Sequence, residues 1–581
     1  MNPALSIVFE YTGLNQSLSA LPSPPIAYPA PHGGIAMLGL MQDAQLLTSQ
    51  TLAYAARVYP NTEIATAENG RVVHRTTYRE ADVRARRLAS TLAQRGLAEE
   101  GVFLGALAWN TWRLFEVMHA VPGAGGVLHT ANPRLHEGHL AYTVNHCGDR
   151  AVFVDHDCLP LAEAIAPDCP GVEHWIILAD RADMPETSLT GVLCYEDLID
   201  EGDPTFAWPE FDERRASTIC FTSATTGEPK GVLYSHRGTV LNVMSIAGKN
   251  GWNLGKGDCV LCAAAFFHCN GWGMPYMAPL TGTKMVLPGR VVSPRAMLDL
   301  FRSESVTHSG GVPTVLMDLL GELQKDGGDF GPLQQLWTGA TAPPESLLRR
   351  VEALGPKVVH AFGMTETTQA LTVAVPDSHA SEAERRAEQQ TQGQPVFLSD
   401  LRAVSEDGLV LPADGVSVGL LQVRGPSVAA AYFKRPDLTP VTADGWLDTG
   451  DIGSVGPEGH MRISDRAKDA IKSGGEWISS VELENTAAGC PGVAEACCIG
   501  VEHPRWQERP LLLIVREAGL DVDEAAVRGY LDGKIARWWM PDAVVFVDSL
   551  PRNGVGKVMK ALLREEYRAV LLEQIAATAA P

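Results

Sequence analysis

From about residue 77, apolar positions with helical spacing alternate along the chain with short runs that are apolar throughout. Thr77 and Glu80 form a capping box, which predicts a helix that continues to a closing glycine at Gly96. The run VFLGALA (102–108) predicts a buried strand, and TWRLFEVMHAVPGAGG (111–126) predicts a helix that ends in a glycine turn. Fully apolar strands are typical of parallel sheets covered by helices on both faces.

The same alternation returns further along the chain. AVFVD (151–155) predicts another strand. KMVLP (284–288) precedes a helix around RAMLDLFRSES (295–305), and VTHSGGVP (306–313) precedes a helix around TVLMDLLGEL (314–323). Repeated units of this kind predict the α/β fold class.

The character of the sequence changes in its last third. After about residue 400 it consists of short strands and turns, and a final region of helices and strands runs from about 480 to the end. A burst of charge around 465–469 suggests a boundary. We therefore expect a large domain over 37–467 and a small domain over 468–581.

Two segments are expected to lie outside these domains or on their surface. Residues 1–36 are Pro-rich and lack periodicity, so we expect an N-terminal extension, with Met37 as an alternative start. Residues 377–392, DSHASEAERRAEQQTQ, are charged and weakly periodic, which predicts an exposed insertion.

Composition and charge exclude several classes of function. The 581 residues are too many for one core, and 45% of them are hydrophobic, as in globular proteins. The formal net charge of -22 argues against a nucleic-acid binder or a protein that binds anionic membranes. The sequence contains no run of eighteen or more apolar residues, so it predicts no membrane-spanning helix. We expect a cytoplasmic protein.

The cysteines raise the question of a metal site. CVLCAAAFFHC (259–269) contains Cys259, Cys262, His268 and Cys269 at a spacing that superficially resembles zinc ligands. The run is apolar, however, and in a buried strand Cys259 and Cys262 would point to opposite faces. We interpret these cysteines as buried free thiols.

The stretch TSATTGEPKG (222–231) has the composition of a phosphate-binding loop. Gly227 and Gly231 allow backbone amides to turn toward an anion, and Lys230 adds a mobile positive charge. The stretch differs from the G-x-x-x-x-G-K-[ST] loop, because the lysine precedes a glycine. A polar surface turn is the alternative interpretation. Its hydroxyl donors are Thr222, Ser223, Thr225 and Thr226.

Five stretches in this order resemble the acyl- and aryl-CoA synthetases among the adenylate-forming enzymes. They are FTSATTGEPKGVLYSH (221–236), HAFGMTETTQ (360–369), GWLDTGDIG (445–453), SDRAKDAIKSGGEWISSVELE (464–484) and PRNGVGK (551–557). Fainter likeness reaches back to Met37. The resemblance implies a large N-terminal domain of stacked α/β sheets with a small barrel-like part, followed by a small, mobile α+β C-terminal domain.

The resemblance also implies the reaction and its cofactors. In this family a carboxylate attacks the α-phosphorus of ATP, pyrophosphate leaves, and a thiol such as that of CoA displaces AMP. Thr222 to Lys230 would hold the departing phosphates, with Thr226 catalytic. Glu366 and Thr225 would bind Mg²⁺ through hard oxygens.

Further residues of the resemblance surround the nucleotide. Phe362 would stack on adenine, Thr365 would donate to the α-phosphate, and Asp451 and Arg466 would bind the ribose. The adenine-binding stretch comprises His360, Ala361, Phe362, Gly363, Met364 and Thr365.

The small domain would present two faces to one site in turn, rotating about a hinge at Lys468. The resemblance implies that Lys557 is the catalytic lysine of the first face, the face presented during adenylation of the acid. Lys472, with Trp477 and a pair of glycines, belongs to the second face, which admits the thiol. Relatives of this kind often dimerise, so a homodimer is a further expectation.

The sequence indicates the acid pocket less clearly than the rest of the site. The residues expected to line it are mostly apolar. That character suits a medium-chain, branched or aromatic acid. Its candidate lining residues are His268, Trp272, Met274, Gly339, Ala340 and Thr341.

One departure from the family pattern leaves alternatives open. Position 224 is alanine where the phosphate loop normally carries glycine, and an added Cβ penalises a positive φ by about 1 kcal/mol or more. We therefore keep two alternatives to an acid–CoA ligase. One is an enzyme that activates nitrite for transfer to an aromatic amine, and the other is a non-catalytic nucleotide-binding scaffold.

Overall fold

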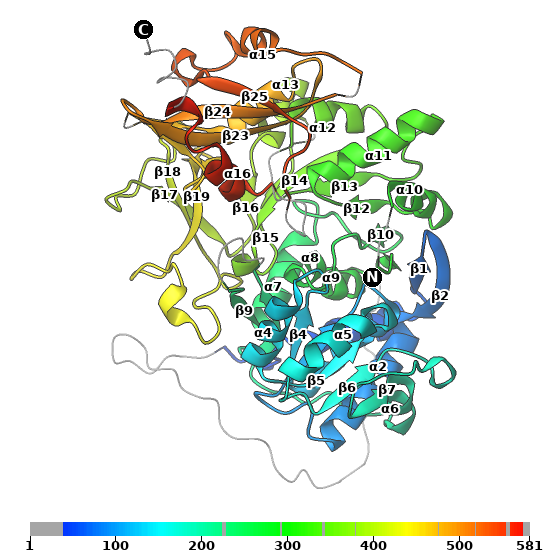
Figure 1. Cartoon of the computed structure of the whole chain (residues 1–581). Coiled ribbons are helices and arrows are strands. Elements are labelled where there is room, and N and C mark those ends of the chain that lie inside the picture. The colour runs from blue at the N-terminus through cyan, green and yellow to red at the C-terminus, as the bar shows by residue number, and fades with distance from the viewer. Residues whose placement is uncertain are drawn as a thin grey trace, which may run out of the picture. The chain divides into compact units, whose positions relative to one another are not determined.

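The computed structural model describes residues 39–222, 228–290, 293–339, 343–377, 379–474, 476–517, 519–552 and 558–572. The chain falls into two compact units, Met1–Ala44 and Gln45–Pro581. All elements described below belong to the second unit (Figure 1).

A seven-stranded sheet in the first half of the chain carries the phosphate loop. Its neighbouring strands are parallel, except that β9 runs antiparallel to β8. In spatial order the strands are β7 (Val192–Cys194), β6 (His174–Ile177), β5 (Asp149–Val154), β3 (Phe103–Leu107), β4 (Val127–Ala131), β8 (Ala216–Phe221) and β9 (Gly231–Ser235). The helices of this region are α2 (Tyr78–Gln94), α3 (Trp112–Ala124), α4 (Glu137–Cys147), α5 (Leu159–Ile165) and α6 (Tyr195–Glu201).

A second, nine-stranded sheet is parallel at its centre and antiparallel at both edges. Its order is β16 (Gln394–Pro395), β15 (Ala370–Ala374), β14 (Lys357–Gly363), β13 (Gln335–Thr338), β12 (His308–Gly310), β10 (Cys259–Leu261), β11 (Lys284–Leu287), β1 (Glu63–Glu68) and β2 (Arg71–Thr77). Its helices are α10 (Pro294–Ser303), α11 (Pro313–Asp326), α12 (Glu345–Glu352) and α13 (Glu382–Gln389). The remaining helices of this half are α1 (Ser49–Val58), α7 (His236–Ile246), α8 (Cys269–Trp272) and α9 (Met274–Thr281).

One hydrophobic core joins the two large sheets. Leu104 of β3 and Met285 of β11 belong to the same buried cluster, together with Phe115 of α3. The far face of the nine-stranded sheet packs against α10, α11 and α12, and the far face of the seven-stranded sheet packs against α4 and α5. The predicted helix-covered parallel sheets are therefore present.

Local signals in the sequence account for several of these elements. The capping box predicted at Thr77 and Glu80 is formed at the start of α2. The glycine turn predicted after α3 is formed by Gly125, whose φ of 107° lies in the left-handed region that favours glycine.

The cysteine interpretation is confirmed for the described residues. Cys259 and Cys262 are free and buried, and they lie in different hydrophobic clusters on opposite sides of the nine-stranded sheet.

The last third contains two smaller sheets. An antiparallel sheet consists of β17 (Asp400–Val404), β18 (Gly419–Arg424), β19 (Leu447–Val455) and β20 (Met461–Arg466). A mixed C-terminal sheet, orange in Figure 1, consists of β22 (Glu476–Ile478), β21 (Ile471–Ser473), β24 (Gln507–Arg516), β23 (Val493–His503) and β25 (Ala543–Val547). Its helices are α14 (Ser480–Ala487), α15 (Glu524–Leu531) and α16 (Lys560–Tyr567). The fold is thus a large N-terminal α/β part followed by a smaller α+β part.

The segment 377–392 is an exposed insertion only in part. The first turns of α13 are exposed, but Gln389 and Thr391 are buried. Gln389 donates through Nε2 to the Val358 carbonyl at 3.0 Å, so the end of the segment is anchored to β14. The spacing of apolar residues did not indicate this anchored end, because the residues that form it, Gln389 and Thr391, are polar.

No helix in the described part of the chain has the length and apolar character needed to cross a membrane.

Candidate active site

The phosphate loop begins and ends on two paired strands. The Thr222 amide donates to the Lys230 carbonyl at 2.9 Å, and the Lys230 amide donates to Thr222 Oγ1 at 3.2 Å. These bonds close the loop at its base, directly after β8 and directly before β9. The remaining predicted loop residues, Ser223, Thr225, Thr226 and Gly227, lie outside the described residues, as does Ala224.

Tyr432 joins two of the predicted nucleotide-binding residues. Lys230 Nζ lies 5.1 Å from the centre of its ring, and its hydroxyl donates to Glu366 Oε1 at 2.5 Å. Burial, followed by the neighbouring Glu366 carboxylate, raises the pKa of Tyr432, so the phenol stays protonated and remains a donor. Lys230 and Glu366 come from segments far apart in the sequence and share this one neighbour.

Glu366 has the chemistry of a magnesium ligand. It sits in a short turn, Thr365–Thr367, directly after β14, and the hydroxyl of Tyr234 fixes that turn by donating to the Thr365 carbonyl at 2.7 Å. Tyr432 uses one lone pair of Oε1, which leaves the other lone pairs of the carboxylate for a cation. A buried carboxylate beside a phosphate-binding loop fits Mg²⁺, which typically takes one or two carboxylates together with phosphate oxygens.

Asp451 and Arg466 meet across two antiparallel strands. They are directly opposite in the register of β19 and β20, and Arg466 Nε lies 2.7 Å from Asp451 Oδ1. The Asp451 side chain is 2% exposed whereas that of Arg466 is 42% exposed. The structure therefore brings the two predicted ribose-binding residues together.

The adenine-binding stretch lies mostly inside the protein. His360 donates through Nδ1 to the Thr391 carbonyl at 2.7 Å, and burial lowers its pKa to about 4, so the imidazole is neutral. Phe362 is 7% exposed and packs in a hydrophobic cluster with Leu371 and Leu421. His360 thus has a structural contact that the sequence did not indicate, and most of the Phe362 ring is already covered.

The rest of the stretch is a strand end and the turn that follows it. Ala361 and Gly363 belong to β14, and the Met364 amide donates to Thr367 Oγ1 at 3.0 Å. Gly363 is exposed, and a Cβ there would approach the Gln369 carbonyl to 2.1 Å. The position therefore requires glycine.

Three of the predicted acid-pocket residues, His268, Trp272 and Met274, lie in or directly beside an unusual left-handed turn. Five consecutive residues from Cys269 to Gly273 have φ values between 38° and 74°. This conformation costs each non-glycine residue about 1–2 kcal/mol, so contacts with residues outside the turn must stabilise it.

Asn270 supplies that support. Its Oδ1 accepts from Thr218 Oγ1 at 2.5 Å, and its Nδ2 donates to Thr130 Oγ1 and Cys220 Sγ, both at 3.2 Å. The side chain is buried against the neighbouring strands β4 and β8. It fixes the turn that sets the positions of His268 and Trp272.

The pocket residues themselves differ in exposure. His268 is exposed, Trp272 is half-buried, and Met274 is buried in the core. A Cβ added to Gly310 would come within 2.8 Å of the Trp272 ring, and one added to Gly339 would come within 2.7 Å of the Ala361 carbonyl oxygen. Ala340 and Thr341 lie outside the described residues.

The structure does not bring Lys472 to the nucleotide-binding residues. Its Nζ lies 3.0 Å from Glu406 Oε1 and 4.5 Å from the centre of the Trp477 ring. Lys468, the predicted hinge, is exposed between β20 and β21. Lys557, the predicted adenylation lysine, lies outside the described residues.

The sequence did not reveal a charged network on either side of the predicted hinge. Lys560 Nζ lies 2.7 Å from Glu484 Oε1 and donates to Ser480 Oγ at 2.6 Å. Asp465 Oδ2 accepts from the Ser480 amide at 2.6 Å, and Arg564 forms an ion pair with Asp469. Burial raises the pKa of Asp465 and of Glu484, and Lys560 opposes both shifts.

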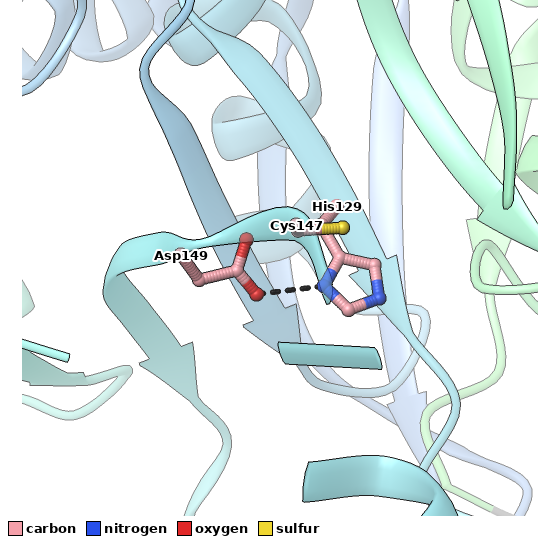
Figure 2. Close-up of side chains that lie close together, drawn as sticks. All are labelled: His129, Cys147 and Asp149. Carbon is pink, nitrogen blue, oxygen red and sulfur yellow. Dashed lines mark hydrogen bonds and ion pairs between the residues drawn. The ribbon is translucent and has the colours of Figure 1, made fainter. Parts of the chain in front are cut away.

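The sequence also did not reveal a buried His–Asp pair beside the phosphate loop (Figure 2). His129 Nδ1 and Asp149 Oδ2 are 2.7 Å apart, and Cys147 lies next to them. Burial raises the pKa of Asp149, and His129 opposes this shift. Two polar residues inside the otherwise apolar run of β4, His129 and Thr130, were the available signal.

Comparison with known proteins identifies relatives over nearly the whole chain. Residues 52–433 match the family described as AMP-binding enzyme, and residues 482–557 match the AMP-binding enzyme C-terminal domain. A 3-methylmercaptopropionyl-CoA ligase from Ruegeria lacuscaerulensis is 42% identical, covering 92% of this chain and 100% of the relative. A medium-chain-fatty-acid–CoA ligase from Ectopseudomonas oleovorans is 40% identical, covering 92% and 98%.

Solved structures share the fold. ATP-bound MatB from Rhodopseudomonas palustris superimposes with a TM-score of 0.74 at 26% identity, covering 89% of this chain and 99% of that chain. The anthranilate CoA ligase AuaEII in complex with anthranoyl-AMP gives a TM-score of 0.79 at 21% identity, covering 90% and 98%. The domain boundary predicted at residue 468 falls between the two family matches and remains a prediction.

Proposed function

Because the chain belongs to the AMP-binding enzyme family, we propose that it uses ATP to activate a carboxylic acid as an acyl-adenylate and then transfers the acyl group to CoA. The observation that carries this proposal is the contact of Tyr432 with both Lys230 and Glu366. A lysine at the end of the proposed phosphate loop and a hard carboxylate thereby share one neighbouring side chain. This pairing suits a triphosphate that must be neutralised while pyrophosphate leaves.

In the first step the carboxylate oxygen of the acid attacks the α-phosphorus and pyrophosphate departs. Lys230 binds the departing phosphates, and Asp451 accepts from the ribose hydroxyls while Arg466 holds that carboxylate in place. Glu366, with Thr225, would hold Mg²⁺, which offsets phosphate charge when bound. The first-face lysine, Lys557, meets the carboxylate and the α-phosphate as negative charge develops.

In the second step the CoA thiol attacks the acyl carbon and AMP leaves. The small domain rotates about Lys468 and presents Lys472 and Trp477 to the site. The contact of Lys472 with Glu406 supports assigning the described arrangement to the first step, since it keeps the second face occupied elsewhere. An exposed pair of this kind contributes only about 0–1 kcal/mol, so it does not prevent rotation.

The substrate is proposed to be a short- to medium-chain aliphatic acid. Support comes from two relatives at 42% and 40% identity, whose names specify a 3-methylmercaptopropionyl group and medium-chain fatty acids, whereas a relative from Thermus thermophilus at 39% identity is named for long-chain fatty acids. The close approach of Trp272 to Gly310 supports a pocket of limited depth, because the ring lies against the strand that would form the pocket floor.

Product analysis across an acid panel tests this proposal. The full-length protein is incubated with ATP, Mg²⁺, CoA and straight-chain acids of increasing length. Acid-dependent pyrophosphate release, AMP and an acyl-CoA product are expected. AMP formed only with nitrite and an aromatic amine would contradict the proposal, as would ATP binding without turnover on any substrate. Neither of these alternatives gains support from the relatives found.

A further inference from the structure

Gln369 carries a buried amide whose hydrogen-bonding atoms are not used inside the protein. The residue is 3% exposed, and neither Oε1 nor Nε2 has a hydrogen-bond partner among the described residues. A glutamine amide accepts through its oxygen and donates through its nitrogen, and buried groups of this kind are rarely left without a partner. The amide is therefore a candidate contact for a bound molecule.

The backbone directs this amide toward the predicted acid pocket. Thr368, the residue before it, has a φ of 66°, which a β-branched residue rarely adopts. Thr368 Oγ1 donates to the Ser427 carbonyl at 2.7 Å and so helps to hold this conformation. A Cβ added to Gly273 would lie 2.1 Å from Gln369 Oε1 and 2.5 Å from Nε2. The amide thus lies directly against the left-handed turn that carries predicted pocket residues.

The same turn leads from the nucleotide-binding residues to this amide. At its start, Cys269 Sγ lies 3.7 Å from Oγ1 of Thr365, the predicted donor to the α-phosphate. At its end, Gly273 lies against the Gln369 amide. The acid carboxylate meets the α-phosphorus beside Thr365, so an acid tail that follows the turn from there reaches Gln369. Trp272, which precedes Gly273, is only half-buried, so this side of the turn is partly open.

The surroundings of the amide favour a neutral partner. Met274 and Ala370, which follow Gly273 and Gln369 in the chain, belong to the large hydrophobic core. Burying an ion in such surroundings is costly unless a counter-charge is present. The unused oxygen and nitrogen together suit a neutral group that both donates and accepts, and a hydroxyl is the smallest such group.

We propose that Gln369 is a specificity-determining residue that selects acids whose chain carries a hydroxyl group. Nε2 donates to the hydroxyl oxygen, and Oε1 accepts the hydroxyl hydrogen. The inference rests on the proposed function, which supplies the acid, and it narrows the aliphatic acids proposed above to hydroxylated ones. A site built to bind a hydroxyl disfavours the analogue that lacks it, whereas a purely apolar pocket discriminates weakly.

A buried water molecule is the main alternative partner for the amide. It would bond to the same two atoms, but it would stabilise the protein in the absence of an acid. Gln369→Met keeps the length and unbranched shape of the side chain and removes both polar atoms. If the amide is completed by the acid, this variant should unfold at the same or a higher urea concentration than the unmodified protein.

Acid-dependent ATP–pyrophosphate exchange in the full-length protein, without CoA, measures the selectivity. The panel contains acids with a terminal hydroxyl, from hydroxybutyrate to hydroxyoctanoate, each paired with the alkanoate that has a methyl group in its place. The unmodified protein should prefer the hydroxylated member of at least one pair. Gln369→Met should shift that preference toward the alkanoate by about 5-fold to 150-fold, the effect of leaving a buried hydroxyl without its partner.

Gln392→Met is the matched control. Gln392 is also buried, but its Oε1 accepts from the Ile463 amide at 2.6 Å. This variant should unfold at a lower urea concentration and leave the preference within each pair unchanged. The proposal would be overturned by a preference for the alkanoate in every pair, or by equal preferences in Gln369→Met and the unmodified protein. A lower urea midpoint for Gln369→Met with unchanged preferences would assign the amide to a buried water.

Exchange and thioester formation separate this inference from the proposed function. Exchange with alkanoates alone would overturn the inference and leave the adenylation step of the proposed function intact. A hydroxyl preference that Gln369→Met removes, in a protein that forms no CoA thioester, would refute only the transfer to CoA.

Discussion

At the scale of single residues, the site depends on a few side chains that hold other side chains in place. Tyr432 contacts the proposed magnesium ligand Glu366 through its hydroxyl and the proposed phosphate-binding Lys230 through its ring. Asn270 uses all its hydrogen-bonding atoms to hold a left-handed turn. Neither residue stands out in the sequence, because its partners lie far away along the chain.

Replacing Tyr432 with phenylalanine should slow adenylation and leave the fold intact. The change removes the donor to Glu366 Oε1 but keeps the ring beside Lys230. Loss of a hydrogen bond to a charged group costs about 1.5–3 kcal/mol, which corresponds to about a 10-fold to 150-fold slower ATP–pyrophosphate exchange. Tyr530→Phe on α15 is the matched control, and an equal effect in both variants would refute the assignment.

Asn270→Asp should raise the KM for the acid and lower the free energy of unfolding. The carboxylate can still accept from Thr218, but it cannot donate to Thr130 or Cys220. A cost of about 1–3 kcal/mol is expected in urea unfolding. Asn253 also has a positive φ and is exposed, so Asn253→Asp should change neither quantity. If the acid KM of Asn270→Asp is unchanged, the turn does not shape the pocket.

At the scale of elements, the sequence predicted the parallel strands and their helices well but missed polar anchors. The continuous apolar runs of β3 and β11 are local signals, and so is the capping box of α2. Tertiary contacts reinforce them. The buried end of the 377–392 segment and the Asp465–Glu484–Lys560 network depend on partners distant in sequence. Such contacts leave no periodic pattern in one chain.

The residues of the candidate site also fall into two groups, those that a local motif indicates and those that only a contact between distant segments brings together. Lys230, Glu366, Asp451 and Arg466 could be named because motifs carry them, and the structure pairs Asp451 with Arg466 and links Lys230 to Glu366 through Tyr432. His129 and Asp149 could not be named, since nothing in the sequence indicates that β4 and β5 place them 2.7 Å apart.

The helix α16 should depend on the ion pair at its first residue. Lys560→Met leaves Glu484 without its cation and removes the positive charge near Asp465. Breaking a buried pair from one side costs about 3–5 kcal/mol in the free energy of unfolding.

Adding Glu484→Gln to Lys560→Met should recover part of that loss in chemical denaturation. Lys325→Met, at a lysine whose side chain is 72% exposed, is the matched control. If the double variant were less stable than Lys560→Met alone, the charged pair would not be the cause.

At the scale of the whole molecule, buried histidines link stability to pH. His236 accepts from the Thr48 amide at 3.2 Å through Nδ1, and burial lowers its pKa to about 3 from an ordinary value of 6.5. Below pH 6.5 His236 is protonated in the unfolded chain, whereas in the folded chain its buried imidazole stays neutral until the pH approaches 3. The stability contributed by neutral His236 is therefore lost as the pH falls from 6.5 toward 3.

His236→Asn keeps an acceptor for Thr48 but cannot titrate. Relative to this variant, the unmodified protein should lose about 2 kcal/mol of unfolding free energy between pH 7 and pH 5. Urea unfolding at a series of pH values measures the difference. A difference that stays constant with pH would show that His236 is protonated in the folded state.

The whole account depends on segments spread over 581 residues acting on one nucleotide in two successive reactions. Mass spectrometry of a single reaction with ATP, Mg²⁺, CoA and a medium-chain acid tests this most directly. We predict one acyl-CoA, one AMP and one pyrophosphate per turnover, with acyl-adenylate accumulating when CoA is withheld. Formation of ADP, or an acyl-CoA that appears without AMP, would contradict it.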